Sequence, residues 1–321
     1  MLSKYQEFLE KKLSKQEFNE NPKNLYEPID YIMKLSGKRI RPILVLLASD
    51  AYNHTLEDAW AAALSVEIFH NFSLVHDDIM DHAPLRRGNI TVHEKWDTNV
   101  AILSGDAMLI LAIQKLEYYN GIRFENLIKL LCKTALQVCE GQQMDVDFET
   151  MKFVLEEDYI TMISKKTAVL VAASLQMGAI VADATIFEQE NIYNFGLNLG
   201  IAFQLQDDYL DAFGNPETFG KKVGGDIIEN KKTYLFIKSL ESNDEKLKQE
   251  LLDLYKIKDE NESKIEKVKN IFITTGASQK TLDAIEIYTN KALKTLELLS
   301  ITEDKKQLLQ NFANYLMKRK Q

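Results

Sequence analysis

Apolar residues recur at intervals of three and four along most of this chain, for example between residues 127 and 138 and between residues 192 and 205. Such spacing places apolar side chains on one face of an α-helix. Alternating apolar and polar stretches bounded by turn residues, which would indicate strands, are hard to find. The pattern therefore predicts an all-α fold.

Proline, the residue that most strongly breaks helices, is scarce. It stands only at positions 22, 28, 42, 84 and 216. Turn-forming residues interrupt the pattern at short segments, namely 36–37, 83–89, 120–121, 214–225 and 242–243. None of these segments is long or polar enough to be an interdomain linker. We expect long helices in a single domain, 1–321, with the Lys- and Glu-rich part 241–321 forming amphipathic helices outside a core.

Composition narrows the class of protein. The chain has 321 residues, 45% of them hydrophobic, which is enough to fill a sizeable core. Its 39 basic and 48 acidic residues give a formal charge of −9, and no basic block stands out, which argues against nucleic-acid binding. Cys132 and Cys139 lie about 10 Å apart on a helix, beyond disulfide reach. Reduced thiols and the lack of an apolar signal-peptide core at the N-terminus predict a cytoplasmic protein.

The most apolar window, Thr167 to Phe187, resembles a membrane span in composition. Ser174, Gln176 and Asp183 interrupt it, and its alanines suit close helix packing. A span requires an uninterrupted run of about 18 or more apolar residues. We therefore expect a buried core helix here and no integral membrane contact.

Two copies of the pentapeptide Asp-Asp-x-x-Asp, at 77–81 and 207–211, each end an apolar helical stretch. On a helix, Asp77 and Asp81 lie on one face, as do Asp207 and Asp211. Like charges at this spacing destabilise a helix by roughly a few tenths of a kcal/mol per pair. One copy alone would be typical of a solvated helix end. Two copies on helices that require burial indicate bound cations, and open sets of carboxylates suit Mg²⁺ with phosphate oxygens completing its shell.

Basic residues cluster near both motifs. The clusters are Lys38, Arg39 and Arg41 between Gly37 and Pro42; Arg86-Arg87-Gly88; Lys166-Thr167; and Lys221 and Lys222 before Gly224-Gly225-Asp226, with Lys231 nearby. Guanidinium groups bind phosphate bidentately, so an arginine pair in one turn can hold two phosphate groups. Each cluster alone could be a charged surface turn or a set of solvated lysines. Together they exceed what one diphosphate needs and indicate two diphosphate substrates.

These motifs occur in an order that resembles the trans-isoprenyl diphosphate synthases, the family of farnesyl and geranylgeranyl diphosphate synthases. The likeness covers about residues 31–240 and includes the stretch 70–81, Gly141-Gln142-x-x-Asp145 and Phe203-Gln204 before the second motif. Ser36 departs from the pattern, because the family often has a second glycine there. The resemblance implies a single-domain bundle of long helices around a central cavity and a homodimer.

The resemblance also assigns roles to individual residues. It implies that Asp77, Asp81, Asp145, Asp207 and Asp211 hold up to three Mg²⁺ ions. It places the allylic diphosphate on Arg86, Lys166, Lys222 and Lys231, and isopentenyl diphosphate on Lys38, Arg41, His70 and Arg87. Thr167 and Gln204 would direct oxygens toward the allylic cation. Each lysine doublet, 165–166 and 221–222, offers two candidates, and Lys222 is preferred for its nine-residue spacing to Lys231.

Product length follows from the helix that carries Asp77. The growing chain would extend along this helix toward its start, so side chains one or more turns earlier act as a floor. Phe72 lies about 7.5 Å along the helix axis from Asp77 and is bulky, whereas Ser73 is small. Phe69 lies one turn earlier and would add to the floor. Alternatively, both phenylalanines are ordinary core residues. In the family an aromatic residue at the Phe72 position accompanies short products. We expect a C15 to C20 product and favour C20, because Ser73 is not a second aromatic.

Other functions fit the sequence less well. The dipeptide His76-Asp77 is found in helical metal-dependent phosphohydrolases, but those sites need histidines from other helices, and the remaining histidines are local to this region. A terpene cyclase also ionises an allylic diphosphate, but it has no second diphosphate site. A non-catalytic partner subunit would have lost carboxylates that are all present here.

Overall fold

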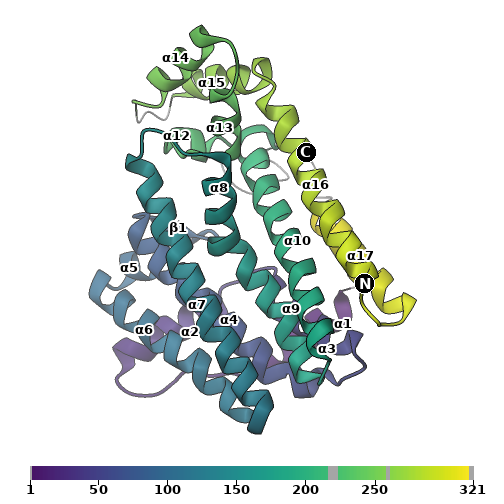
Figure 1. Cartoon of the computed structure of the whole chain (residues 1–321). Helices are drawn as coiled ribbons and strands as arrows, with labels where there is room; N and C mark the ends of the chain where they lie inside the picture. The colour runs from purple at the N-terminus through teal and green to yellow at the C-terminus, as the bar shows by residue number, and fades with distance from the viewer. Residues whose placement is uncertain (1, 216–222, 258–260, 318–321) are drawn as a thin grey trace. The chain divides into compact units, whose positions relative to one another are not determined.

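The computed structural model describes residues 2–215, 223–257 and 261–317. Most of these residues are helical, and the strands are very short, which confirms the all-α prediction (Figure 1). Strands β1 (Leu85–Arg86) and β2 (Asn89–Ile90) form an antiparallel hairpin. The chain divides into two compact units, Met1–Lys133 with Ala173–Glu190, and Thr134–Ala172 with Asn191–Gln321. The single-domain prediction stays a prediction.

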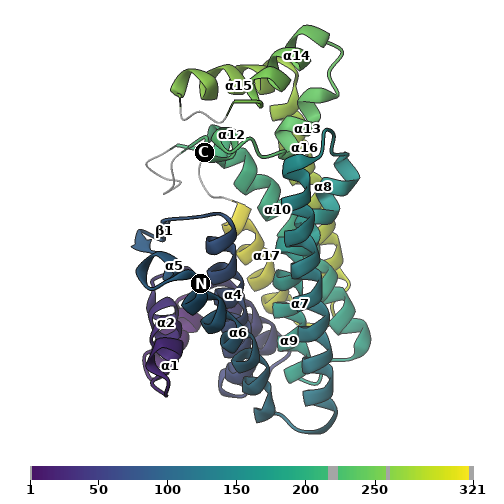
Figure 2. The same ribbon diagram turned by 90° about the vertical axis from the view of Figure 1, so that its left-hand side faces the viewer.

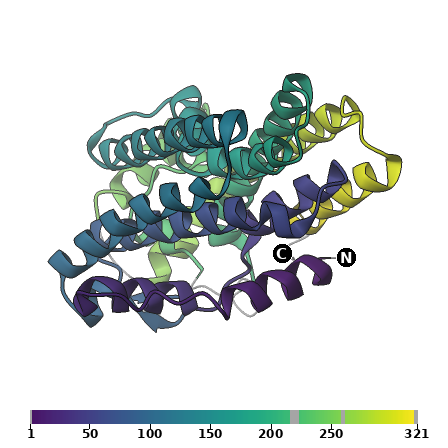
Figure 3. The same cartoon turned by 90° about the horizontal axis from the view of Figure 1, so that it is seen from below.

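The first unit holds the N-terminal helices. They are α1 (Ser3–Leu13), α2 (Lys23–Lys34), α3 (Ile40–Ala51), α4 (Leu56–Met80), α5 (Val92–Lys95), α6 (Thr98–Lys115) and the short η1 (Leu116–Tyr118). Helix α4 packs against α2, α3 and α6. Figure 2 shows α2, α4 and α6 side by side, and Figure 3 gives the view from below. Helix α4 packs closely on α6 at Gly105. A Cβ added at this glycine would lie 2.2 Å from Nε2 of His76.

Local capping fixes where α4 and α6 begin. The Thr55 side chain accepts a hydrogen bond from the backbone N–H of Asp58 at 3.1 Å, and acidic residues occupy the first turn of α4. Asp97 caps α6 in the same way through the N–H of Val100 at 2.8 Å. Such caps satisfy backbone donors that have no partner inside the helix. They fix the register of α4, and through it the position of the first aspartate motif at its far end.

The remaining helices begin with α7 (Gly121–Thr150). Three of the described helices, α7, α9 (Val169–Val181) and α10 (Ile186–Phe213), have residues in both units. The others are α8 (Glu156–Ile163), the π-helical segment η2 (Ser164–Ala168), α12 (Gly225–Ile228), α13 (Tyr234–Leu240), α14 (Glu245–Leu254), α15 (Glu262–Thr274), α16 (Ala277–Glu297) and α17 (Glu303–Met317).

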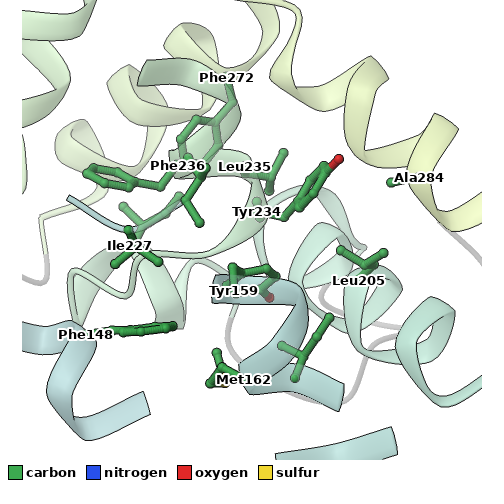
Figure 4. Packing of buried hydrophobic residues seen from close by; sticks show 14 of the residues in the cluster. Phe148, Tyr159, Met162, Leu205, Ile227, Tyr234, Leu235, Phe236, Phe272 and Ala284 are labelled. Carbon is green, nitrogen blue, oxygen red and sulfur yellow. The ribbon is translucent and has the colours of Figure 1, made fainter. Parts of the chain in front are cut away.

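The core of the second unit is rich in aromatic side chains and surrounds α13 (Figure 4). Helix α13 is buried from Tyr234 to Ser239 and packs against α8, α15 and α16. Lys238 lies in this buried stretch and forms ion pairs with Glu156 and Glu241. Helices α15 and α16 thus pack on a buried element of this core. The outer position expected for the whole part after residue 241 stays a prediction.

The apolar window 167–187 is buried only in part and is not one helix. Helix α9 ends at Val181, Asp183 adopts a left-handed conformation with φ 53°, and Phe187 at the start of α10 is exposed. The prediction of a single core helix was therefore wrong at its C-terminal end. Asp183 accepts a hydrogen bond from Arg123 at 3.3 Å. The charge that interrupts the window thus marks a turn.

By length and composition, a different helix, Thr98–Tyr118, is the one candidate membrane span among the described residues. Core helices of soluble proteins pass the same test, and 33% of the window is buried.

Close helix contact in the first unit gives a stability test. A Cβ at Gly178 would lie 2.3 Å from the carbonyl oxygen of Val45 and 2.7 Å from Cβ of Ala48. Gly178→Ala should gain roughly 0.5–1 kcal/mol of helix propensity but lose about 1–3 kcal/mol to overpacking. We expect a lower denaturation midpoint in guanidinium. Adding Ala48→Gly should not restore it, because the nearest clash is with backbone; full recovery would contradict this account.

Candidate active site

The first aspartate motif lies at the C-terminal end of α4. Asp81 is the C-cap, and its backbone N–H donates to the carbonyl of Asp77 at 2.8 Å, so the two residues are one turn apart as predicted. No basic residue occupies the last turn. Carboxylates at the negative end of a helix dipole are unfavourable. Their position therefore favours a cation-binding role over a structural one.

Asp78, between these two residues, turns inward. It is fully buried, and its Oδ1 accepts hydrogen bonds from Nε of Arg86 at 2.8 Å and from the same guanidinium's Nη2. Burial raises the pKa of Asp78, and the bond from Arg86 partly offsets this rise. The β1–β2 hairpin returns Arg86 to α4. Asp78 thus holds Arg86 in place. The sequence analysis did not predict this role, although the second aspartate of the Asp-Asp doublet was the available signal.

Four predicted isopentenyl diphosphate residues come from the α2–α3 loop, the start of α3, α4 and the hairpin. Nη1 of Arg41 lies 3.0 Å from Nε2 of His70. Burial, followed by the charge of Arg41, lowers the pKa of His70 well below its usual value, so its ring is neutral and Nε2 accepts from Arg41. Burial lowers the pKa of Arg41 to about 10, which leaves it charged at neutral pH. Lys38 is exposed on the same loop.

Arg87 reaches this loop from the hairpin. Its Nη1 donates to the carbonyl of Ser36 at 3.2 Å, and a Cβ at Gly37 would lie 2.5 Å from the same nitrogen. A side chain at position 37 would therefore displace the guanidinium end of Arg87 from this contact. Ser36 contributes its backbone here, so the side chain that departs from the family pattern does not disturb this contact.

Arg39 supports the loop and was not predicted as a site residue. Its backbone is left-handed, with φ 47°, and its guanidinium pairs with buried Glu67 and donates to the carbonyls of Met33 and Leu35 at 2.7 and 2.6 Å. The third cation in the run Lys38 to Arg41 was the available signal. Nothing in the pattern indicated Glu67 as its partner.

The proposed floor residues lie on α4. Phe69 is fully buried, and its ring centroid lies 5.5 Å from that of Phe72. The Phe72 ring lies 4.9 Å from His76, and the Ser73 hydroxyl donates to the carbonyl of His70 at 2.9 Å. Nε2 of His76 lies 3.2 Å from the carbonyl of Ile102 on α6. His76 thus takes part in helix packing, which weighs against the phosphohydrolase alternative.

In the second unit, the π-helical segment Ser164–Ala168 is held between α7 and α10. A Cβ at Gly141 would lie 2.2 Å from the backbone nitrogen of Lys166, and one at Gly200 would lie 2.6 Å from Cα of Ala168. The two glycines allow both helices to approach the segment closely. Single π-turns occur frequently at functional sites, and this one presents Lys166 and Thr167.

The same packing distinguishes the two lysines of the first doublet. Nζ of Lys166 lies 2.5 Å from Oδ2 of Asp145, another predicted site residue on α7. Lys165 instead pairs with exposed Glu140 at 2.8 Å. On the other side of the segment, the Thr167 hydroxyl donates to Oε1 of Gln204 at 3.0 Å. The structure therefore brings Asp145, Lys166, Thr167 and Gln204 together.

The second aspartate motif lies in the last turns of α10, again without a basic residue in the final turn. Oδ1 of Asp211 accepts a hydrogen bond from the backbone N–H of Asp226 at 2.9 Å. The backbone carbonyl of Asp211 accepts one from the backbone N–H of Gly224 at 2.6 Å. Asp208 is buried, and its pKa is raised well above the usual value by burial and then by the charges of Asp226, Asp211 and Asp145. Asp226 thus joins the predicted carboxylates. The sequence analysis named it within Gly224-Gly225-Asp226 but predicted no role for it.

Lys231 follows Asp226 in the same loop. Its Nζ lies 3.0 Å from Glu229 and 3.9 Å from Oδ1 of Asp226. Lys221 and Lys222 both lie outside the described residues, so the preference for Lys222 stays a prediction.

Among the described residues, no three His, Cys, Asp or Glu side chains gather closely enough to form a metal site by themselves. The donor chemistry nevertheless fits Mg²⁺, which usually keeps several waters and binds through one or two carboxylates plus substrate phosphates. Asp77 with Asp81, and Asp207 with Asp211, are carboxylate pairs of this type.

The helical architecture and the aspartate-rich helix ends define an all-α enzyme of the isoprenoid synthase fold. The chain belongs to the polyprenyl synthetase family, whose sequence model matches residues 22–272. It is 33% identical over 320 residues to a short chain isoprenyl diphosphate synthase of Methanothermobacter thermautotrophicus, covering 99% of this chain and 98% of that protein. It is 35% identical to a geranylgeranyl diphosphate synthase of Saccharolobus solfataricus over 94% of this chain and 92% of that one.

Its fold closely matches a crystal structure of geranylgeranyl pyrophosphate synthase, with a TM-score of 0.96, 51% identity and coverage of 100% of this chain and 99% of that one. The predicted family and the predicted prenyltransferase class are thereby confirmed. The individual roles of the site residues stay predictions.

The lysine doublet at 165–166 gives a direct test. Lys166→Ala should reduce kcat for prenyl transfer at least about 10²-fold, because it removes a cation directed at departing diphosphate. Lys165→Ala is the matched control and should change kcat less than about fivefold, since an exposed ion pair contributes at most about 1 kcal/mol. Steady-state kinetics of both variants would decide, and equal losses would contradict the assignment.

Proposed function

We propose that this enzyme condenses isopentenyl diphosphate with an allylic diphosphate to give geranylgeranyl diphosphate, using up to three Mg²⁺ ions. The observation that carries this proposal is the second cationic set, Arg41 with His70 and Arg87 beside the Ser36 and Gly37 backbone. A terpene cyclase needs only one diphosphate site. The two geranylgeranyl diphosphate synthases named above support the C20 product.

In the proposed mechanism, Arg86, Lys166 and Lys231 stabilise the diphosphate that leaves the allylic substrate. Bound Mg²⁺ would supply further Lewis-acid stabilisation of that charge. Oxygens of Thr167 and Gln204 face the allylic cation. The double bond of isopentenyl diphosphate, held by the second cationic set, attacks this cation, and proton loss to the departing diphosphate gives a product five carbons longer. Exclusion of water protects the cation.

In this proposal the carboxylate pair of each motif holds Mg²⁺ for the reaction. Asp77→Ala and Asp207→Ala should each lose most activity in steady-state assays with Mg²⁺, because each variant removes a carboxylate that would hold a cation at diphosphate. Turnover close to that of the wild type in either variant would count against the metal-binding role of its motif.

Product analysis tests the activity. Incubation with isopentenyl diphosphate, Mg²⁺ and dimethylallyl, geranyl or farnesyl diphosphate should give a C20 product by chromatography, and EDTA should abolish its formation. Phosphate release without elongation would indicate a hydrolase, a hydrocarbon product a cyclase, and inertness a non-catalytic partner.

The floor residues predict opposite shifts in product length. Phe72→Ala should lengthen the product, because it removes bulk about one and a half turns before Asp77. Ser73→Phe should shorten it toward C15. Chromatography of the dephosphorylated products measures both. A product distribution that neither variant changes would remove these residues as the floor.

We infer that the enzyme is a cytoplasmic homodimer. Family likeness supports this, and so does an exposed apolar face on α6 formed by Ile102, Leu103 and Ile110, the last two 59% and 63% exposed. Contiguous exposed apolar residues indicate an interaction surface. Asp106 lies on the same face, and an aspartate at the centre of a membrane span costs about 2.5–3.5 kcal/mol. A second copy of the chain is therefore the favoured occupant.

Charge placed on this face should separate the subunits. Leu103→Glu with Ile110→Glu should halve the mass measured by light scattering, because burying two carboxylates in an apolar interface is costly. Ile273→Glu, which changes an equally exposed isoleucine on α15, is the control. Unchanged mass, or co-flotation of the wild-type protein with lipid vesicles, would contradict the assignment.

A further inference from the structure

Four side chains of the second unit form one hydrogen-bonded chain. The Tyr159 hydroxyl on α8 donates to Oδ2 of Asp208 on α10, and Nε2 of Gln204 donates to Oδ1 of the same carboxyl at 2.9 Å. The Thr167 hydroxyl in η2 donates to Oε1 of Gln204 at 3.0 Å. The chain thus runs from the buried aromatic core, where Figure 4 shows Tyr159, to two residues assigned to the allylic cation.

Asp208 sets the direction of these bonds. An amide side chain has one donor end and one acceptor end. With its NH₂ group turned toward the Asp208 oxygen, Gln204 presents its carbonyl oxygen to Thr167. The hydroxyl proton of Thr167 is then committed to Gln204, which leaves the hydroxyl lone pairs for the substrate side. Oxygen lone pairs directed at a developing carbocation stabilise it without reorganisation at the moment of reaction.

Tyr159 fixes this arrangement from behind. It is 3% exposed and lies in the aromatic cluster, so its rotamer is restricted by packing. Its hydroxyl satisfies the oxygen of Asp208 that does not accept from Gln204. Without that donor the buried carboxyl would lack one of its two partners and could rotate toward another one. Gln204 would lose its fixed orientation as a result.

We infer that Tyr159 is a positioning residue, which acts through Asp208 to orient Gln204 and Thr167 for stabilisation of the allylic cation. This inference rests on the proposed function and adds a residue that no motif of the sequence indicated. Tyr159 touches no substrate in this account, so its contribution should appear in the chemical step and not in substrate binding.

The first test is a matched pair of hydroxyl deletions. Tyr159→Phe should lower kcat about tenfold or more while KM for both diphosphates stays within about twofold. Tyr234→Phe is the control, because its hydroxyl also bonds a carboxylate, Glu156 at 2.9 Å, from the same cluster. It should leave kcat unchanged. Equal kcat in Tyr159→Phe and the wild type, or equal losses in the two variants, would overturn the inference.

A double-mutant cycle separates positioning from general destabilisation. If Tyr159 acts through Gln204, adding Tyr159→Phe to Gln204→Ala should lower kcat by less than about twofold. Independent structural damage would multiply the two losses, because effects of uncoupled sites are additive in free energy, and that outcome would overturn the inference. Elongation by the wild type supports the proposed function whichever result the cycle gives.

Discussion

Successive residues on an α-helix point about 100° apart, so two adjacent aspartates cannot serve the same cation from the same direction. This constraint divides the tasks within each motif. Asp77 and Asp207 are half-buried, whereas Asp78 and Asp208 are buried and turn toward partners inside their own unit. The inward carboxylates hold other side chains in place, Arg86 in one unit and Gln204 in the other. In each doublet, the first aspartate is thus available to a cation, and the second holds a neighbouring side chain in place.

Close backbone approach is the second requirement of these sites. Gly141 and Gly200 admit the π-helical segment between two helices, and Gly37 admits the guanidinium of Arg87. A methyl group at any of these positions would meet a heavy atom at 2.7 Å or less. At Gly141 and Gly200 the neighbour is backbone, so overpacking there displaces the π-helical segment and the lysine that it presents. At Gly37 the neighbour is the guanidinium of Arg87, which an added side chain would push aside. The glycines of the motifs therefore set distances, and the charged residues depend on them.

The sequence predicted those features that depend on local spacing. The helical class and the one-turn relation of Asp77 to Asp81 follow from periodicities of three and four, which pattern reading detects well. The breaks between helices follow from turn-forming residues. The pairing of Lys166 with Asp145 and of Arg39 with Glu67 could not be predicted, because each joins residues 20 or more apart through tertiary packing. Tyr159 was missed for the same reason, since its role depends on a carboxylate 49 residues away.

The charge distribution also links the structure to its substrates. The whole chain carries a formal charge of −9, yet burial and then the charges of four arginines lower the pKa of His70. A neutral histidine accepts a hydrogen bond from Arg41 without adding a further positive charge to this crowded set. The local field is therefore positive on an acidic protein. Fields of this kind concentrate anions at one site, and under the proposed function a diphosphate bound among the arginines would relieve their mutual repulsion. Glu67, which pairs with Arg39, offsets part of this repulsion within the loop itself.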